Sequence, residues 1–267
     1  MTTPKPTPPP RKVGIVRVEY PNYHRYKIDG KWAIGVTTAL KGIPKDALKY
    51  WAAKTVATHV VENINDVKRM LDAGGAGPTI NYLKEVPNQK RDDAAVRGTD
   101  VHALAEKYIR GEEIEVPLHL QPYVQGYADY IQDWNPTTLH EELVVASRTH
   151  GYAGTLDSIQ DVPGLGRCLV DYKTSNYVFG EHVLQVAAYR YADVFIDADG
   201  VEHPMIPVDR AFILHIKPHD YELIPVQADE DALRKYLAAQ TNYVENVQSN
   251  KLGKLLGTPI APPERAA

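Results

Sequence analysis

Two acidic residues and a lysine interrupt strand-like apolar runs, where charged side chains need a reason. Asp157 lies within "GTLDSIQDV", and Asp171 and Lys173 end the run "RCLVDYKT". Because side chains alternate faces along a strand, Asp171 and Lys173 share one face. If the two runs form a hairpin whose turn centres on Gly164 or Leu165, Asp157 lies opposite Asp171 or Lys173 on that face. The pattern therefore predicts that two carboxylates and one amine converge.

Converging carboxylates favour a bound divalent cation. Two ionised carboxylates at one partly buried place repel each other and lose hydration, and direct coordination of a cation removes that cost. Oxygen ligands suit Mg²⁺ or Mn²⁺. Such a cation can polarise a phosphoryl oxygen and lower the pKa of water, while a neighbouring lysine orients that water and offsets developing charge. These groups indicate hydrolysis of a phosphodiester.

An Asp-x-Lys triplet is a weak signal by itself, because ordinary charge content produces one by chance in a chain of this size. Residues 29–31 (DGK) and 66–68 (DVK) match it too. The first triplet is typical of a hairpin turn, and the second of a polar helix face. Only residues 171–173 (DYK) follow an apolar run and come after a strand that carries an acid. A surface salt bridge between Asp171 and Lys173 is the alternative.

Composition limits the class of protein. The chain has 267 residues, of which 43% are hydrophobic and 24% charged, and this is ordinary for a globular protein with a real core. The start "MTTPKPTPPPRK" lacks the apolar run of a secretory signal, and no stretch approaches the roughly 20 apolar residues of a membrane span. We therefore expect a cytoplasmic protein without a membrane partner. The net charge of −4 argues against a basic coat for nucleic acid but allows a local basic groove.

Cysteine usage limits the possible metal sites. Cys168 is the only cysteine of the chain, which excludes a disulfide framework, a four-thiolate zinc site and a cysteine-ligated iron–sulfur cluster within it. A metal must therefore be bound by oxygen or imidazole. A G-x-x-x-x-G-K-[ST] phosphate loop is also missing, so the chain carries no nucleotide-driven motor of its own.

Periodicity and turn residues predict a mostly helical first half followed by a mixed sheet, hence an α/β fold. We expect a hairpin within residues 16–35 around Asp29-Gly30, and a linker at 74–78. The expected helices cover residues 44–63, 65–73, 88–111, 121–134, 180–195 and 229–248. The expected strands cover residues 141–147, 154–162, 167–174, 210–217 and 221–227.

Four short motifs follow one another in the order of a known family. They read "RGTDVH", "GTLD", "DYK" and "QVAAY", and they extend from Arg97 to Tyr189. In this order they resemble the RecB-like nucleases of the PD-(D/E)XK superfamily, such as the phage-encoded and CRISPR-associated exonucleases and the mitochondrial genome maintenance exonuclease. That family has a Gly-x-x-x-His helix, a Gly-x-x-Asp strand, an Asp/Glu-x-Lys strand and a Gln-x-x-x-Tyr helix. The resemblance extends more weakly to the last helix.

The resemblance implies a restriction-endonuclease-like core with a mixed central sheet and an N-terminal helical cap. Together with the proline-rich, aperiodic ends, it gives a division into a disordered tail (1–12), a hairpin and helical cap region that includes the histidine-bearing helix (13–139), a nuclease core (140–250) and a C-terminal tail (251–267). Many CRISPR-associated relatives add a four-cysteine iron–sulfur cluster. This chain cannot, so packing alone must hold its cap.

The resemblance also assigns roles to residues. As metal ligands it implies His102, Asp157, Asp171 and the backbone carbonyl of Tyr172. The catalytic set comprises the catalytic lysine, Lys173, with Asp157, Asp171, Gln185 and Tyr189, of which Gln185 and Tyr189 match a helix that braces the site and touches DNA. The alternatives are a helix-surface pair of His102 with Glu106 and a helix-face contact between Gln185 and Tyr189.

Five further residues have both a functional and an ordinary interpretation. Glu142 could be an additional metal or water ligand, or an exposed strand acid. Arg97 could contact a phosphate, or be a solvated helix charge. Tyr123, Tyr127 and Tyr130 line one helix face and could stack single-stranded bases, although a core-facing stripe is the simpler interpretation.

These residues together predict a metal-dependent DNA exonuclease that uses Mg²⁺ or Mn²⁺, without an iron–sulfur cluster. We expect it to act on DNA ends, with single strands passing beneath the cap, in phage recombination, replication or repair. A helicase or an annealing protein is a candidate partner. A structure-selective endonuclease is the nearest enzyme alternative, and a catalytically silent nucleic-acid-binding subunit is the alternative from another class.

Overall fold

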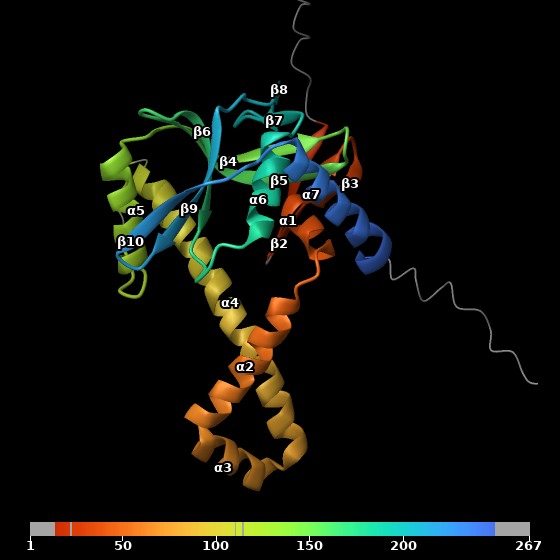
Figure 1. Cartoon of the computed structure of the whole chain (residues 1–267), viewed down its shortest axis with the longest axis vertical. Helices are drawn as coiled ribbons and strands as arrows, with labels where there is room; N and C mark the ends of the chain where they lie inside the picture. Colours follow the sequence, from red (N-terminus) through yellow and green to blue (C-terminus); the bar gives the residue numbers. More distant parts are fainter. Residues whose placement is uncertain (1–13, 22, 110, 114, 249–267) are drawn as a thin grey trace, which may run out of the picture.

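A computed structural model describes residues 14–21, 23–109, 111–113 and 115–248 (Figure 1), so the predicted tails lie outside the described residues. The helices are α1 (Val36–Ala39), α2 (Asp46–Glu62), α3 (Ile64–Gly74), α4 (Ala76–Ile109), α5 (Gln121–Trp134), α6 (Gly180–Arg190) and α7 (Glu230–Asn242), with a 3-10 turn η1 (Leu40–Gly42) and a π-helical segment η2 (Tyr243–Gln248). The strands are β1 (Ile15–Tyr20), β2 (Tyr23–Ile28), β3 (Lys31–Gly35), β4 (Thr137–Ser147), β5 (Tyr152–Val162), β6 (Gly166–Lys173), β7 (Val194–Ile196), β8 (Glu202–Pro204), β9 (Arg210–Lys217) and β10 (Asp220–Pro225).

The protein has a mixed α/β fold in which the strands of the described region form one curled sheet. Strand β5 is its centre, because β4 pairs antiparallel along one edge of β5 while β3 and β6 share the other edge. Beyond β6 the sheet continues through a parallel β9 and an antiparallel β10. Beyond β4 it continues through β7 and β8, and beyond β3 through β2 and β1.

Strand β5 carries a fork in this sheet. Its first residues, Tyr152 and Ala153, pair with β3, and residues 158–162 pair with β6. Residues 154–157 lie between these two ladders, so the described strands leave that stretch of the edge without a neighbour. The fork therefore interrupts the strand pairing in the middle of the sheet, and Asp157 lies at the end of the interrupted stretch.

Strand β4 is irregular opposite the fork. The register pairs Glu141 with Ser158 and Leu143 with Leu156, which places Glu142 across from Asp157. Glu142 has φ 46°, a left-handed conformation that is rare for a non-glycine residue inside a strand. Such conformations cluster at functional sites, because the surrounding structure must hold them in place.

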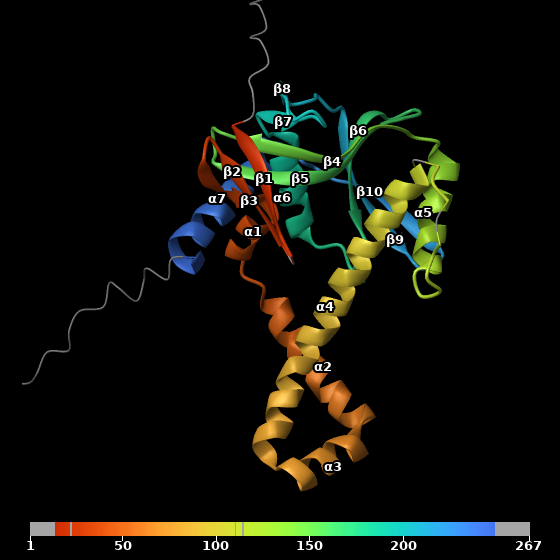
Figure 2. The same cartoon turned by 180° about the vertical axis from the view of Figure 1, so that it is seen from behind.

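Two apolar cores lie on the two faces of the sheet. Helices α6 and α7 cover one face, where residues such as Leu156, Leu169 and Tyr236 are buried. The C-terminal part of α4 and helix α5 cover the other face, where Val101, Val170 and Tyr172 meet. Figure 2 shows the β1–β3 strands (red) at the outer end of the sheet. One face of these strands closes a third, smaller core.

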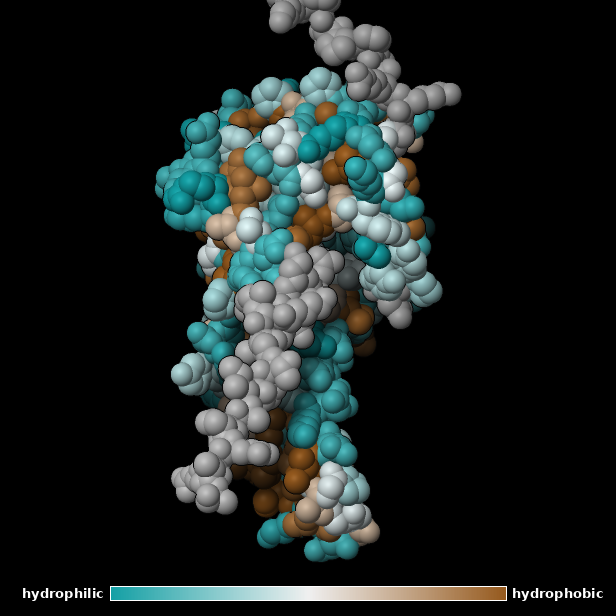
Figure 3. Space-filling model, turned by 90° about the vertical axis from the view of Figure 1, so that its right-hand side faces the viewer, coloured by the Kyte–Doolittle hydropathy of each residue, from teal (hydrophilic) through white to brown (hydrophobic). Residues whose placement is uncertain are grey.

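The helices that were expected to cap the site form a projecting arm. Helix α2 leaves the core, α3 turns, and the 34-residue α4 returns, with contacts between each pair of the three helices (Figure 1). Apolar side chains are exposed along the arm, and Figure 3 shows apolar surface towards its far end. Despite the length of α4, no helix within the described ranges has the apolar length needed to cross a bilayer.

Several expected elements are confirmed. Helices α2, α3 and α5 and strands β4, β5, β6, β9 and β10 all form close to their predicted ranges. The Asp29-Gly30 turn also forms, between β2 and β3. The segment before it differs, however, because residues 15–28 make two strands, so that the expected hairpin is a three-stranded meander.

The expected linker at residues 74–78 is wrong. Only Gly75, with φ 77°, interrupts the helices, and α4 begins at Ala76. Pro78 lies in the first turn of α4, where backbone N–H groups have no helical partner, so a proline costs little there. The helix expected to start at residue 88 instead starts at Ala76 and continues through Pro87. The proline removes only one helical hydrogen bond, so it does not end the helix.

The expected helix over residues 180–195 is too long. Helix α6 ends at Arg190, and the apolar residues that follow form β7, which pairs with β4. A short apolar run suits a helix face and a buried strand equally, and the neighbouring strand decides between them. The last predicted helix, over residues 229–248, forms as α7 up to Asn242 and continues as the π-helical η2 from Tyr243 to Gln248.

The predicted division between residues 139 and 140 stays a prediction. That boundary falls within β4, which begins at Thr137. The strands before it belong to the same sheet, because β3 pairs with β5.

Gly154 explains the glycine of the Gly-x-x-Asp motif and yields a test of the packing. A Cβ at Gly154 would lie 2.7 Å from the ring of Tyr189 and 3.0 Å from Val36, which is closer than such atoms approach. We expect Gly154→Ala to lower the free energy of unfolding by ~1–3 kcal/mol, measured by urea denaturation, because overpacking a core costs this much. Gly77→Ala is the matched control, since a Cβ there meets nothing within 4 Å. An equal loss in both variants would contradict the packing explanation.

Candidate active site

The β5–β6 hairpin brings the predicted carboxylates together. The register turns on Gly164, as expected, and places Asp157 next to the Ser158–Val170 pair, opposite Asp171. The Asp157 carboxylate accepts a 2.6 Å hydrogen bond from the backbone N–H of Tyr172. A side chain thus replaces the strand-to-strand bond where the ladder ends. This bond fixes the position of Asp157 beside the Asp-x-Lys motif.

Asp171 lies at the bottom of the site. Its side chain is fully buried, one oxygen forms an ion pair with Lys173, and the other accepts a 3.1 Å hydrogen bond from the Gln185 amide. The same amide lies 3.2 Å from the Tyr189 hydroxyl. Helix α6 therefore supplies both bracing residues from one face. The surface salt bridge considered as the alternative is wrong, because the ion pair is buried.

The electrostatics of this pair are unusual. Burial raises the pKa of Asp171 to about 7, and the nearby Asp157 carboxylate adds to that rise while Lys173 opposes it. For Lys173, burial favours the neutral amine, but the charges of Asp171 and Asp157 outweigh burial and raise its pKa. The lysine therefore stays protonated at neutral pH. Two acids and one cation hold each other in place where water is largely excluded.

Helix α4 brings His102 to the end of β6. Its Nε2 lies 3.2 Å from the carbonyl oxygen of Tyr172, and its Nδ1 lies 3.9 Å from an Asp157 oxygen. Gly98, one turn earlier, makes this approach possible, because a Cβ there would already lie 3.3 Å from the Thr174 hydroxyl. The Gly-x-x-x-His spacing thus has a physical reason. The side chain of Glu106, the alternative partner of His102, lies outside the described residues.

His102, Asp157 and Glu142 form a group that could hold a metal ion. One ligand atom from each lies within 4.8 Å of the others, and the group combines an imidazole with two carboxylates. This donor set fits Mg²⁺ or Mn²⁺ in kind, with the imidazole favouring Mn²⁺. The left-handed backbone of Glu142 presents its side chain towards this group. Sequence reasoning proposed Glu142 only as an additional ligand, whereas the structure places it beside His102 and Asp157.

Asp171 and the Tyr172 carbonyl border this group. Asp171 adjoins Asp157, but its oxygens are engaged by Lys173 and Gln185. The Tyr172 carbonyl accepts a hydrogen bond from Lys173 Nζ at 3.3 Å and lies against His102. Their role as metal ligands stays a prediction. Both offer oxygen atoms, which Mg²⁺ prefers, and both lie beside the group formed by His102, Asp157 and Glu142.

A buried hydrogen-bonded chain that sequence reasoning missed supports Tyr172 from the other face of the sheet. The hydroxyl of Tyr130 donates to Gln160 at 2.7 Å, and the Gln160 amide donates to the Tyr172 hydroxyl at 2.9 Å. Buried polar groups need such partners, and a satisfied chain makes a position rigid. The available signal was Gln160, a large polar residue in the middle of an apolar strand.

The predicted nucleic-acid contacts separate into buried and accessible residues. Tyr127 is 1% exposed and packs in the α4–α5 core with Tyr130, so the core-facing stripe is confirmed and Tyr127 is out of reach of a base. Gln185 and Tyr189 are buried as well, which leaves them the bracing role and not a DNA contact. Arg97 and Tyr123 are half-buried, with the guanidinium 5.4 Å from the ring centre.

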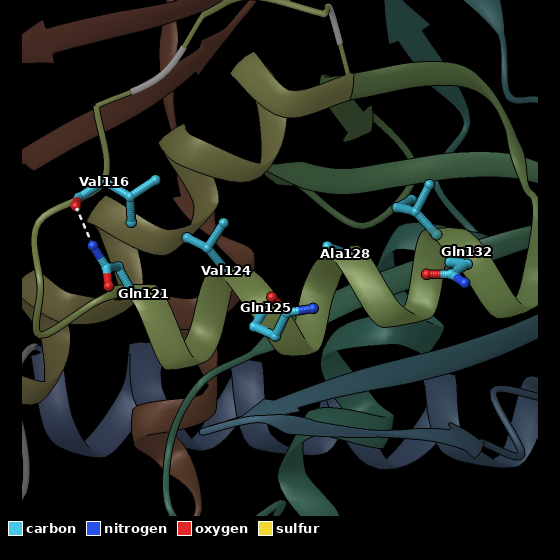
Figure 4. A pocket seen from close by; sticks show the side chains of 7 residues that line it. Val116, Gln121, Val124, Gln125, Ala128 and Gln132 are labelled. Atoms are coloured by element: carbon cyan, nitrogen blue, oxygen red, sulfur yellow. Dashed lines mark hydrogen bonds between the residues drawn. The ribbon is translucent and has the colours of Figure 1, made fainter.

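A hollow along α5 is separate from this site. Figure 4 shows Val124 and Ala128 lining it, with the Gln121 amide bonded to the Val116 carbonyl at 3.3 Å. None of the predicted site residues contributes to its lining. The candidate active site is instead the open end of the β5–β6 hairpin.

Comparison with known proteins gives limited similarity. No family model and no curated protein matches the chain. Among solved structures, the chain is similar to the crystal structure of an alkaline exonuclease (LHK-Exo) from Laribacter hongkongensis, with 14% identity, 61% of this chain and 88% of the other covered, and a TM-score of 0.33. It is also similar to the crystal structure of SSO0001, with 13% identity, coverage of 75% and 86%, and a TM-score of 0.32. At these values the function must be argued from the site itself.

Replacing His102 tests the metal group. We expect His102→Ala to weaken Mn²⁺ binding, measured by calorimetry, by about tenfold or more, because even the loss of an outer-shell partner costs this much. The unfolding midpoint should stay close to that of the parent, since the His102 side chain is 24% exposed and not part of the core. His119→Ala is the control, as His119 is an exposed histidine away from the group. Unchanged Mn²⁺ binding in His102→Ala would mean that His102 is an ordinary helix residue and not a metal ligand.

Proposed function

We propose that the chain is a metal-dependent deoxyribonuclease of the PD-(D/E)XK superfamily, in its RecB-like branch, that hydrolyses phosphodiester bonds from DNA ends. The observation that carries this proposal is the convergence of Asp157, Asp171 and Lys173 at one end of the β5–β6 hairpin, next to His102 and Glu142. These groups come from separate elements, β4, β5, β6 and α4.

Each group has a defined task in such a reaction. His102, Asp157 and Glu142, with Asp171 and the Tyr172 carbonyl beside them, would hold Mg²⁺ or Mn²⁺. A divalent cation bound there supplies Lewis-acid polarisation of the scissile phosphate and a lowered pKa of water. Lys173 offers a protonated amine that orients the attacking water and offsets charge that develops on the phosphate.

The surroundings of Lys173 favour an anionic substrate. Burial lowers the pKa of His182 to about 4, and the nearby Lys173 and Lys45 contribute to the shift. Lys173 and Lys45 thus place two cations on the α6 side of the site, each paired with an acid, although the chain as a whole has a net charge of −4. Arg97 adds a cation on the α4 side. A phosphodiester backbone suits this distribution of charge.

The arm supports action at DNA ends. It begins beside the site, where Lys45 just before α2 pairs with Glu181 of α6 at 2.8 Å, and it returns through α4 to Gly98 and His102. We infer that the strand threads between the arm and the core, and a strand bound in this way has to enter from a free end. This is our reason for preferring an exonuclease to a structure-selective endonuclease. A helicase or an annealing protein would supply processivity.

Replacing the lysine tests the catalytic set. Lys173→Met should lose most turnover of end-labelled DNA, by at least about a hundredfold, because it removes charge stabilisation used in the transition state. Mn²⁺ binding should persist, since Lys173 is not a ligand. Lys235→Met is the matched control, as Lys235 forms an ion pair with Asp231 on the surface of α7. EDTA should abolish activity in the parent, and Mn²⁺ or Mg²⁺ should restore it.

Near-parental turnover in Lys173→Met would reduce the Asp171–Lys173 pair to a structural role. DNA binding without any metal-dependent product would instead support the silent subunit.

Covalently closed DNA tests whether cleavage requires a free DNA end. We expect linear single strands to be consumed in the presence of Mn²⁺, whereas closed single-stranded circles of the same sequence survive, because a circle offers no end to enter beneath the arm. Gel analysis of both substrates over the same time course makes the comparison. Rapid cleavage of the circles would favour the structure-selective endonuclease.

A further inference from the structure

The three N-terminal strands have one buried and one open face. Ile15 and Tyr26 are buried in the small core against β4 and β5. Because side chains alternate, the opposite face carries Val16, Val18 and Tyr20 of β1, Tyr23, Arg25 and Lys27 of β2, and Trp32 of β3. We call these seven residues the outer face. Figure 2 shows no helix in front of the three strands in this view.

Aromatic rings dominate the outer face. Tyr23 is 58% exposed, Trp32 is 45% exposed, and Tyr20 is 36% exposed. The rings of Tyr20 and Tyr23 stack across the β1–β2 pair with centres 4.5 Å apart and planes inclined by 10°. Large aromatic side chains normally bury most of their area, so several exposed together on a flat sheet mark an interaction surface.

Cations accompany the rings. The Arg25 guanidinium lies 3.9 Å from the centre of the Trp32 ring, and the Lys27 ammonium lies 4.7 Å from it. The neighbouring acids are engaged elsewhere, because Glu19 pairs with Arg17 and Asp29 pairs with Arg148. In the part of the chain that the structure describes, neither Arg25 nor Lys27 forms an ion pair with a carboxylate.

We propose that the outer face binds single-stranded nucleic acid, with bases stacked on Tyr20, Tyr23 and Trp32 and phosphates held by Arg25 and Lys27. Exposed rings on a sheet provide stacking platforms for unpaired bases, and interleaved cations neutralise the backbone. The charge is complementary, since a polyanion meets cations that have no competing carboxylate. Arginine planes also stack on bases, so the Arg25–Trp32 pair adds a broad platform.

The outer face is a second contact for the strand and not part of the active site. This proposal rests on the proposed function, because that function is the reason for a nucleic-acid strand to be present. The proposal adds a second surface that binds the same strand. Strand β3 pairs with β5, the strand that bears Asp157, so the two surfaces belong to one hydrogen-bonded sheet. A strand held at both places would stay attached after each cleavage.

The test measures binding in EDTA, so that it does not depend on catalysis. The measurement is fluorescence anisotropy of labelled oligo-dT and oligo-U. An oligonucleotide of about 12 nucleotides is long enough to span a stacking surface of this kind. The first variant combines Tyr23→Ala with Trp32→Ala, and the second combines Arg25→Gln with Lys27→Gln. We expect each to weaken binding by about tenfold. The second variant keeps the apolar side chains, so it remains informative where the first does not fold.

The matched control is Arg234→Gln with Lys235→Gln, which removes two cations from the surface of α7 and changes the net charge equally. It should bind as the parent does. Parental affinity in the Arg25/Lys27 variant, or an equal loss in the control, would overturn the proposal. Comparison of the two oligonucleotides shows whether the face accepts DNA, RNA or both. Failure of the nuclease assay with intact oligonucleotide binding would overturn the proposed function alone.

Discussion

A carboxylate that is completely removed from water, Asp171, sets the main constraint on this structure. Such a group is costly unless it is paired and hydrogen-bonded, and here Lys173 supplies the charge and Gln185 the hydrogen bond. The Gln185 amide also donates a hydrogen bond to the Tyr189 hydroxyl, and the Tyr189 ring occupies the space that Gly154 leaves on β5. One buried acid thus explains the residue types at four positions on three elements.

The fork in the sheet is the second constraint, and it converts this buried pair into an accessible site. A continuous ladder along β5 would pair the Tyr172 N–H with the backbone of β5 and leave Asp157 without this donor. Since β3 pairs with the beginning of β5 and β6 with its end, the middle of that edge is free for side chains. Asp157 uses the freedom to bind the Tyr172 N–H, and the left-handed Glu142 faces it from β4. The irregular backbone is therefore the part of the sheet where chemistry becomes possible.

In the proposed function, two additional surfaces divide the handling of a strand between them. The arm starts and ends beside the site, whereas the outer face of β1–β3 presents rings and cations on other strands of the sheet. Local arrangement matters more than total charge in both cases. A chain with a net charge of −4 can offer positive places because its acids are paired with other partners, as Asp29 is with Arg148.

The sequence alone determined the elements whose signals are local. The hairpin that joins Asp157 to Asp171, the Asp29-Gly30 turn and helix α5 follow from alternation, turn residues and 3.6-residue periodicity, which neighbouring residues impose on one another. Tertiary structure alone decided what depends on distant partners. It made Val194–Ile196 a strand by pairing it with β4, it buried Tyr127 beneath α4, and it brought Glu142 to His102 across a fork that no periodicity encodes. These outcomes depend on which surfaces remain uncovered once the whole sheet has assembled, and a local pattern cannot contain that information.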